Sequence, residues 1–535
     1  MNWQIPIEPV PLNTWNSVST KLRQWVLIEK LKNPFGFITL TLLSCVFALL
    51  IAKKGFVIGV LLMGGIMAPP IVYALVTNPQ LGILAYITLA YAIMFLLRMG
   101  VAFPLGTLMD GMLLLFILNF FIQQKKQKQW DRVNSEVSKW IGIWIIYNIL
   151  QVGNPAAESR AAWVYTVRTI AVVALSYYIF LFNIRTKAFI KTILKFWLFF
   201  SCFAAWYAFK QEFFGFFQFE DDYLHSSDEI QLLLFIAGHW RKFSIFSDPV
   251  TFAYNMVVAS LLCIALLTGP QTPKKTVILI FLIFSMLFNM IFSGTRGAFP
   301  LVPAGLMLYA ILKYSKKILI FVCVAAVFFV GLIFMPTSNQ NILRFQSAFR
   351  PNDDASYKVR KINQARIKPY VWSHPIGGGL GSTGEWGKKF APGSYLSSFP
   401  PDSGYVRTTV EAGPIGLLIF VLMMFHILKT IINNFFRIRD PELKSICLGA
   451  VLVIFAFNIG NFPQEALVQY PSNVYFYLSA ALISVCLRID QELNPFHHEQ
   501  LTAPKKYSFC FCWAKTLVFC FGQQLQKHCL LICQI

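Results

Sequence analysis

Long stretches of this chain are apolar and uncharged, and they constrain its fold more than any other feature. Residues 34–52 read PFGFITLTLLSCVFALLIA, and residues 276–294 are similar. Runs of about 18 or more apolar residues are typical of membrane-spanning helices, because a helix satisfies its own backbone hydrogen bonds within lipid. Only 13% of the residues are charged, roughly half the fraction of a soluble globular protein. The sequence therefore predicts an all-α polytopic membrane protein.

Fourteen apolar runs have about the length of a span. They cover residues 34–52, 55–76, 80–97, 103–122, 140–153, 164–183, 190–209, 249–268, 276–293, 298–314, 318–335, 412–432, 445–462 and 472–487. The run at 140–153 is short, and the first two runs can form one hairpin or a re-entrant segment. We therefore expect about 12–14 transmembrane helices.

Lysine and arginine in the short loops indicate the orientation of the spans. With the N-terminus in the cytoplasm, the loops after even-numbered spans should be basic. Five of them are, through Lys125, Lys126, Lys128, Arg185, Lys187, Lys191, Lys274, Lys275, Lys316, Lys317, Arg437, Arg439 and Lys444. The turn with Lys53 and Lys54 disagrees, so the first hairpin stays open. The formal net charge of +22 fits contact with anionic membrane lipids and argues against nucleic acid as a partner.

On this topology both long polar segments face away from the cytoplasm. We predict a cytoplasmic N-terminal segment at 1–33, N-terminal transmembrane helices at 34–209, a first long outward loop at 210–248, central transmembrane helices at 249–335, a second long outward loop at 336–411, C-terminal transmembrane helices at 412–487 and a cytoplasmic Cys-containing tail at 488–535. The five cysteines of the tail match no zinc-binding spacing.

Four arginines on the outward side break the positive-inside trend. They are Arg160, Arg241, Arg296 and Arg407. A guanidinium group is a planar, permanently charged fork that suits phosphate oxygens. Glycines beside Arg296 also let backbone N–H groups approach an anion. A phosphate or pyrophosphate pocket is one interpretation. The alternatives are arginines that reach lipid headgroups and, for Arg407, a helix-surface ion pair with Glu411.

Asp402 and His374 are candidate catalytic residues in the second outward loop. Asp402 precedes a helix that opens SGYVRTT, so it is either an N-cap or a base for a hydroxyl group. Asp248 before Pro249 has the same two readings. His374 is a lone histidine, which is more often structural than catalytic. It has no Cys, second His or paired carboxylates at ligand spacing, so no metal and no cofactor are predicted.

The segment 374–390, HPIGGGLGSTGEWGKKF, is dense in glycine. Gly377, Gly378, Gly379 and Gly381 belong to it. It is not a nucleotide-binding fingerprint, because no strand precedes it and it faces outward. It is either a flexible loop or part of a binding site.

The order of these motifs resembles the O-antigen ligase and Wzy-type O-antigen polymerase superfamily of bacterial envelope enzymes. An outward arginine precedes FSDPVTFA, then come SGTRG, HPIGGGLGSTG and DSGYVRTTVEAGPIGLLIF. The resemblance covers roughly residues 90–490, and the joint order is more specific than any single motif. RIKPYVWSHPIGGGLGS followed by EAGPIG is the most specific portion.

The resemblance implies a GT-C-like glycosyltransferase in the bacterial inner membrane, with both outward loops in the periplasm. Its donor would be an undecaprenyl-diphosphate-linked glycan, its acceptor a glycan or a lipid A core, and no metal would take part. Arg241 and Arg296 would bind the diphosphate, with Arg160 as a further candidate. Asp402, His374 or Arg407 would act at the reacting centre, and the glycine segment would close over the glycan. Other polysaccharide-assembly proteins would be its partners.

Ligases of the superfamily carry a His–Asn pair where this chain has Asp402–Ser403. This difference favours a polymerase, with ligation of polymer to lipid A core or protein as the alternative. A polysaccharide flippase or exporter is an alternative of another class, and it should carry charges in mid-span. Apart from Asp110 the spans are nearly free of charge, so an enzyme is favoured over a transporter or a non-catalytic scaffold.

Overall fold

The computed structural model describes residues 34–54, 72–100, 105–126, 130–236, 238–314, 316–337, 346, 349 and 355–494. The predicted span 55–76 and the tail 488–535 lie largely outside these residues. The chain divides into two compact units, residues 1–82 and 83–535. The first unit contains α2 (Pro34–Lys54), and α4 (Pro79–Arg98) begins there.

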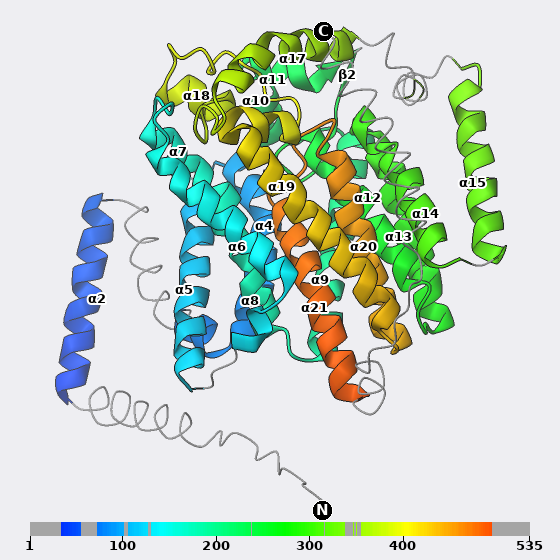
Figure 1. The fold of residues 1–535 in the computed structure, drawn as a ribbon. Coiled ribbons are helices and arrows are strands. Elements are labelled where there is room, and N and C mark those ends of the chain that lie inside the picture. The colour runs from blue at the N-terminus through cyan, green and yellow to red at the C-terminus, as the bar shows by residue number, and fades with distance from the viewer. Residues whose placement is uncertain are drawn as a thin grey trace, which may run out of the picture. The chain divides into compact units, whose positions relative to one another are not determined.

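The second unit is almost entirely helical (Figure 1). After α4 its elements are α5 (Leu105–Lys126), η2 (Trp130–Val133), α6 (Glu136–Leu150), η3 (Gln151–Gly153), α7 (Arg160–Val167), the π-helical turn η4 (Arg168–Val172), α8 (Ser176–Asn183), α9 (Lys187–Phe213), α10 (Gln218–Leu224), α11 (Asp228–Leu234), β1 (Phe235–Ile236), β2 (His239–Trp240), α12 (Pro249–Leu266), α13 (Pro273–Ile291), η5 (Arg296–Ala298), α14 (Leu301–Leu312), α15 (Lys316–Phe334), α17 (Ala355–Ser373), α18 (Gly384–Phe390), α19 (Gly404–Arg437), α20 (Pro441–Gly460) and α21 (Ser472–Leu493). The two short strands pair antiparallel.

Nine helical segments of the described residues are long and apolar enough to cross a membrane: 79–98, 105–125, 160–183, 187–213, 249–266, 273–291, 404–437, 441–460 and 472–493. The prediction of an all-α polytopic membrane protein is confirmed. Two predicted spans are shorter than a bilayer requires. Helices α6 and α14 have 15 and 12 residues, hence lengths of about 22 and 18 Å against a hydrocarbon core of about 30 Å.

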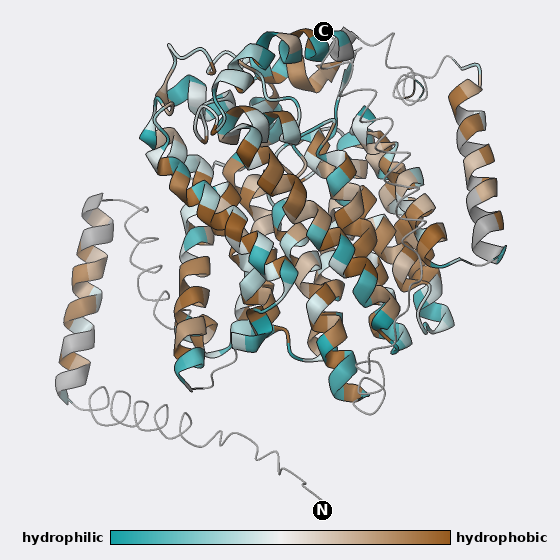
Figure 2. Cartoon of the chain, viewed as in Figure 1, coloured by the Kyte–Doolittle hydropathy of each residue, from teal (hydrophilic) through white to brown (hydrophobic). Residues whose placement is uncertain are grey.

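The core of the second unit is built on α12, α20 and α21. Between 78% and 83% of their apolar windows is buried inside the protein, and small residues allow close approach. A Cβ atom at Gly449 would lie 2.5 Å from a Leu262 methyl group. Close packing of small residues is what holds helices together where no water is displaced. Figure 2 shows apolar residues along these helices and polar residues at their ends.

The basic loops of the second unit meet at one end, which we call the basic end. Lys187, the first residue of α9, forms ion pairs with Asp440 and Glu442 at the start of α20, at 2.8 and 2.9 Å. Arg488 of α21 donates to the carbonyl of Ile184 at 2.7 Å. Loops far apart in sequence thus gather on one side.

The opposite end holds α10, α11, α17 and α18 (Figure 1), and we call it the polar end. It comprises residues 214–248, 355–403 and 461–471. Both long polar segments therefore lie together, as the predicted topology requires. The helix expected after Asp402 is α19, which begins at Gly404 and contains the predicted span 412–432. It is broken by a non-helical Gly413 before Pro414, so only its part after the break resembles a simple span.

A mid-span charge has a partner in the structure. Asp110 of α5 forms an ion pair with Arg168 of η4. Arg168 lies in the predicted span 164–183, so Asp110 is not the isolated charge of the spans that the sequence reading supposed. A paired acid and base within a bundle lowers the cost of both charges, and this pair ties α5 to η4.

Candidate functional site

Arg241 and Arg296 come together at the polar end, on the side of α12 and α13. Arg241 follows the β1–β2 hairpin, and its Nε donates to the Ser293 carbonyl at 2.9 Å. One terminal nitrogen donates to Thr295 Oγ1 at 3.0 Å. Thr295 directly precedes the half-buried Arg296, which opens η5. We call residues 293–298 together with Arg241 the arginine turn.

The arginine turn is fixed to the bundle. Thr295 Oγ1 donates to the Pro249 carbonyl at 3.0 Å, and Gly294 has a φ of +58°, a conformation that glycine adopts without a Cβ clash. A Cβ atom at Gly297 would lie 2.9 Å from the Tyr254 hydroxyl. The backbone beside Arg296 is therefore held in place with little room to spare.

Asp402 lies near a different arginine, Arg360 of α17. Its Oδ2 is 4.0 Å from the Arg360 Nε, and Arg360 also donates to the Pro463 carbonyl at 3.0 Å. Burial raises the pKa of Asp402, and Arg360 opposes that shift. A carboxylate with a raised pKa is better suited to accept a proton from a hydroxyl group. Pro463 is also 3.3 Å from the Cβ position of Gly297, so Arg360, the partner of Asp402, and the arginine turn have a common neighbour.

Asp402 and Asp248 were each expected to be either an N-cap or a base, and they have different positions in the structure. The reading of Asp402 as an N-cap is wrong, because Ser403 occupies the N-cap position of α19 without a side-chain cap. Asp248 is the N-cap of α12 and accepts from the backbone N–H groups of Val250 and Thr251 at 2.8 and 2.9 Å. Its role is therefore local and structural.

Arg407 is neither a surface residue nor available to a substrate phosphate. Its side chain is 13% exposed and forms ion pairs with Glu411 at 3.2 Å and with Glu465 at 2.7 Å. Thr383 donates to Glu411 at 2.5 Å. The predicted Arg407–Glu411 pair exists, but it is buried and extended to a triad. The triad joins α19 to the 461–471 loop.

His374 does not share a centre with Asp402. It follows α17, its ring stacks on Tyr370 with centroids 4.0 Å apart, and Nδ1 hydrogen-bonds to the Tyr370 carbonyl at 3.0 Å. Fourteen residues separate His374 from Arg360, or about 21 Å of helix. Because Asp402 lies at Arg360, the two candidate bases cannot act on one atom.

The first part of the glycine segment, residues 377–383, is tightly packed. A Cβ atom at Gly377 would stand 2.4 Å from the Glu411 carbonyl oxygen, and one at Gly381 would stand 2.4 Å from Thr166 Oγ1. Gly378 and Gly379 donate to the carbonyls of Val410 and Glu411, both at 2.9 Å.

Side chains hold the same backbone from the other face. Asn154 donates to the carbonyls of Ile376 and Gly377 at 3.1 and 3.0 Å. This packing does not fit a cover that closes over the glycan, because a moving loop would lose all of these contacts.

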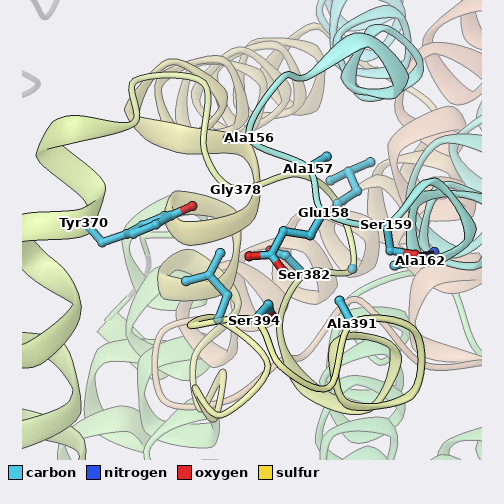
Figure 3. A pocket seen from close by; sticks show the side chains of 13 residues that line it. Ala156, Ala157, Glu158, Ser159, Ala162, Tyr370, Gly378, Ser382, Ala391 and Ser394 are labelled. Atoms are coloured by element: carbon cyan, nitrogen blue, oxygen red, sulfur yellow. Dashed lines mark hydrogen bonds between the residues drawn. The ribbon is translucent and has the colours of Figure 1, made fainter.

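A small pocket beside this segment is too small for a sugar. It lies between residues 156–162 and 378–396, and Figure 3 shows Glu158 entering it, with Tyr370 on the opposite wall. Its volume of about 10 Å³ is at the lower limit for one water molecule. Burial raises the pKa of Tyr370, and Glu158 adds to the shift.

Arg160 has different surroundings from the arginine turn. It is exposed at the first turn of α7, and α7 packs against α18 through stacking of Tyr165 on Trp386, with centroids 4.6 Å apart. Its place is on the glycine-segment side of the polar end.

A much larger cavity opens beside the arginine turn, and its residues were missed in the sequence. Its volume is about 710 Å³, and its lining includes Arg98, Tyr223 and Glu385. Arg98 ends α4 and stacks on Phe243, with its Cζ 4.3 Å from the ring centroid. The positive-inside rule could have identified Arg98 in the sequence. Like the four candidate arginines, Arg98 lies on the predicted outward side, at the end of a span.

Among the described residues, no group of three or more His, Cys, Asp or Glu side chains is arranged to hold a metal ion. Several cations of the polar end are instead paired with carboxylates, as Arg407 is with Glu465 and Lys388 with Glu229, and Arg241 is directed at carbonyl and hydroxyl oxygens.

Residues 281–421 match the family model described as O-antigen ligase. The match includes η5, α17, the glycine segment and the first part of α19. No curated protein matches the chain. This match, over about a quarter of the chain, supports the resemblance to the O-antigen ligase and Wzy-type polymerase superfamily and a ligase- or polymerase-type function in envelope polysaccharide assembly.

Proposed function

We propose that the protein is a metal-independent membrane glycosyltransferase that polymerises or transfers a glycan linked to undecaprenyl diphosphate. The reaction would take place on the periplasmic face of the bacterial inner membrane. The observation that carries the proposal is the arginine turn. It brings Arg241 to the residue next to Arg296, outside the spans and within reach of the membrane surface.

The chemistry of the transfer explains why such a turn is needed. When the sugar–diphosphate bond breaks, negative charge develops on the leaving diphosphate. Guanidinium groups that are already in place stabilise this charge without reorganisation, which is worth several kcal/mol in a site with little water. The hydrogen bonds from Arg241 to Ser293 and Thr295 provide that preorganisation.

The acceptor hydroxyl needs a base, and Asp402 is the best placed of the predicted candidates. It is half-buried, its pKa is raised by burial, and its partner Arg360 donates to Pro463, which lies against Gly297 of the arginine turn. His374 and Arg407 are assigned structural roles, because one stacks at a helix end and the other is occupied by two carboxylates.

Transfer of finished polymer to lipid A core or protein is the second candidate, and the family description favours it. The products distinguish the two. A polymerase gives banded long chains on the lipid carrier, whereas a ligase caps an acceptor in one step.

The test is Arg296→Ala in a strain that lacks the chromosomal copy. We expect elongation or ligation to fall by about 100-fold or more, as when one charge-stabilising group is removed, while protein level and membrane insertion stay normal. Arg296→Lys should also fail, because an ammonium group cannot make two parallel hydrogen bonds. Glycan gels and membrane immunoblots give both readouts.

Arg366→Ala is the matched control. Arg366 is an exposed arginine at the same end, bonded to Ser398, and its loss should leave the glycan pattern unchanged. A wild-type glycan pattern in Arg296→Ala would remove the proposed function. Labelling of an Arg366→Cys variant from the cytoplasmic side would contradict the periplasmic orientation.

A further inference from the structure

The large cavity lies where the apolar spans give way to the polar end. One wall is the end of α4, and the others come from α10, α18, the chain before α12 and the 461–471 loop. A volume of about 710 Å³ is in the range of sites that hold small organic ligands, about 300–1,000 Å³. Its polar lining residues are Arg98, Asp222, Tyr223, Ser247, Glu385 and Gln469.

The cavity and the arginine turn share a segment of backbone. Ser247 lines the cavity, and two residues later the Pro249 carbonyl accepts a hydrogen bond from Thr295 of the turn. Two residues of chain span at most about 7 Å. A ligand whose diphosphate lies on the arginine turn therefore has its neighbouring groups close to this cavity.

The aromatic face in the cavity is held in place. Tyr223 packs edge-on against Phe243, with centroids 5.9 Å apart, and the Arg98 guanidinium lies 5.7 Å from the Tyr223 centroid. Arg98 in turn donates to the carbonyls of Ser244 and Phe246. A fixed aromatic ring beside hydrogen-bonding groups suits a sugar, whose C–H face packs on the ring while its hydroxyl groups bond at the edge.

The charge of the lining distinguishes this cavity from the arginine turn. Its charged groups are Arg98, Asp222 and Glu385, so the formal sum is minus one. Burial raises the pKa of Tyr223, Arg98 opposes the shift, and the Asp248 and Glu385 carboxylates add to it. Carboxylates accept hydrogen bonds from hydroxyl groups and attract amines, but they repel phosphate and uronate groups.

We propose that this cavity binds the sugar residues next to the reacting bond, and that it selects neutral or amino sugars over acidic ones. Tyr223 supplies the stacking face, and Asp222 and Glu385 set the charge preference. The identity of the ligand as part of a glycan substrate rests on the proposed function. The binding preference itself does not require transfer.

The experiment measures binding of three soluble trisaccharides to the full-length protein in nanodiscs, by saturation-transfer NMR with competition. The probes are the trimers of N-acetylglucosamine, glucosamine and galacturonic acid, which are neutral, cationic and anionic. We expect the anionic trimer to bind at least about threefold more weakly than the neutral one, the effect of one unit charge at about 6 Å in water. Equal affinity for the neutral and anionic trimers would overturn the proposal.

Two variants test which residues produce the charge preference and the binding of the trimers. Asp222→Asn with Glu385→Gln should bring the affinities for the three trimers together. Tyr223→Ala should weaken binding of all three by about twofold to tenfold. Unchanged binding in both variants would overturn the proposal even if the wild-type protein discriminates.

Asp221→Asn with Glu229→Gln is the matched control, since it removes two carboxylates of the same polar end that do not line the cavity. It should keep the wild-type preference. Arg296→Ala should bind the trimers normally while it loses transfer. A failure of the proposed function would appear as normal transfer in Arg296→Ala, and a failure of the cavity proposal would appear in the trimer affinities.

Discussion

The polar end of this protein has a packed side and a hollow side. On the packed side the first part of the glycine segment, residues 375–383, lies against the Gly413 break of α19, and a Cβ atom at Gly413 would come within 2.2 Å of the Pro375 carbonyl oxygen. On the hollow side a cavity of about 710 Å³ opens beside Arg98 and Tyr223. Both sides belong to the long polar segments, and they differ in whether the backbone leaves room for a ligand.

This difference shows that the most conspicuous segment of the sequence is not the segment with room for a ligand. The glycine-dense segment is the most conspicuous polar stretch of the chain, yet its glycines are there because no side chain fits. The residues around the cavity are ordinary in sequence, and they matter because elements distant in sequence bring them together. A glycine-dense loop in such a chain is therefore as readily a packing device as a binding loop.

The largest effect is expected for Gly377→Ala, on the packed side. Gly377 has a φ of +77°, and its Cβ position is 2.4 Å from two backbone atoms. A side chain in this conformation costs about 1–3 kcal/mol, and overpacking against backbone adds about 1–3 kcal/mol. The variant should lose most folded protein, as measured by the monodisperse peak in detergent and its thermal midpoint.

Gly393→Ala is the control for this substitution. Gly393 lies in the same polar segment, with a φ outside the left-handed region and open space around its Cβ position, so the change should stay within about 0.5 kcal/mol. Normal stability of Gly377→Ala would show that the packed side is loose, and the comparison of the two sides would fail.

A somewhat smaller effect is expected for Arg407→Ala, which breaks the triad next to the glycine segment. Removal of the guanidinium leaves Glu411 and Glu465 facing each other in a buried site, and breaking such a pair costs about 3–5 kcal/mol. Thermal unfolding should show a large loss that Arg296→Ala does not share.

A triple change sharpens this prediction. Arg407→Met with Glu411→Gln and Glu465→Gln removes all three charges at similar volume, and buried ion pairs replaced in this way are often neutral or more stable. It should recover most of the stability lost in Arg407→Ala. If the triple variant is as unstable as the single one, the loss comes from packing and the triad is not an electrostatic unit.

Much of the fold followed from the sequence, because apolar runs report directly on membrane spans. The basic residues around Lys187 and Lys444 and the polar segments around Asp248 and Asp402 lie at opposite ends of the second unit, and which end faces the cytoplasm stays a prediction of the charge pattern. The helix that opens after Asp402 was expected and is α19, but Arg407 and Glu411 were expected to pair on its surface, and the membrane span was placed only from residue 412. Their charges are satisfied by each other and by Glu465, and that partner is 54 residues beyond Glu411.

The candidate site was predicted in part for a similar reason. Residue chemistry and motif order singled out Arg241 and Arg296, and the structure places them at one turn. It separates His374 from Asp402, which are only 28 residues apart in sequence, because Asp402 lies near Arg360 in the first half of α17 and His374 follows the last residue of that helix. Arg98 was missed, although it obeys the same outward-arginine rule, because no motif accompanies it.

The smallest expected effect is a pH dependence from Glu465, at the edge of the packed side. Burial raises the pKa of Glu465 above its ordinary value of 4.5, Arg407 opposes the shift, and Glu411 and Asp402 add to it. The folded protein thus holds this proton more tightly than the unfolded chain. Between 4.5 and the raised pKa, stability should fall as the pH rises, by at most about 1.4 kcal/mol per pH unit.

Other carboxylates make the stability change with pH in the opposite direction, so the measurement compares the wild type with a variant that lacks only Glu465. Burial acts to raise the pKa of Asp440 at the basic end, but its bonds with Lys187 and with the start of α20 hold it below the ordinary value, and its contribution to stability is lost as the pH falls. Subtracting the thermal midpoints of Glu465→Gln from those of the wild type, from pH 4.5 to 8, cancels this term. The difference should favour the wild type at low pH and shrink as the pH rises. The reverse slope would mean that Arg407 outweighs burial at Glu465, and that the packed side holds its charges as a fully ionised network.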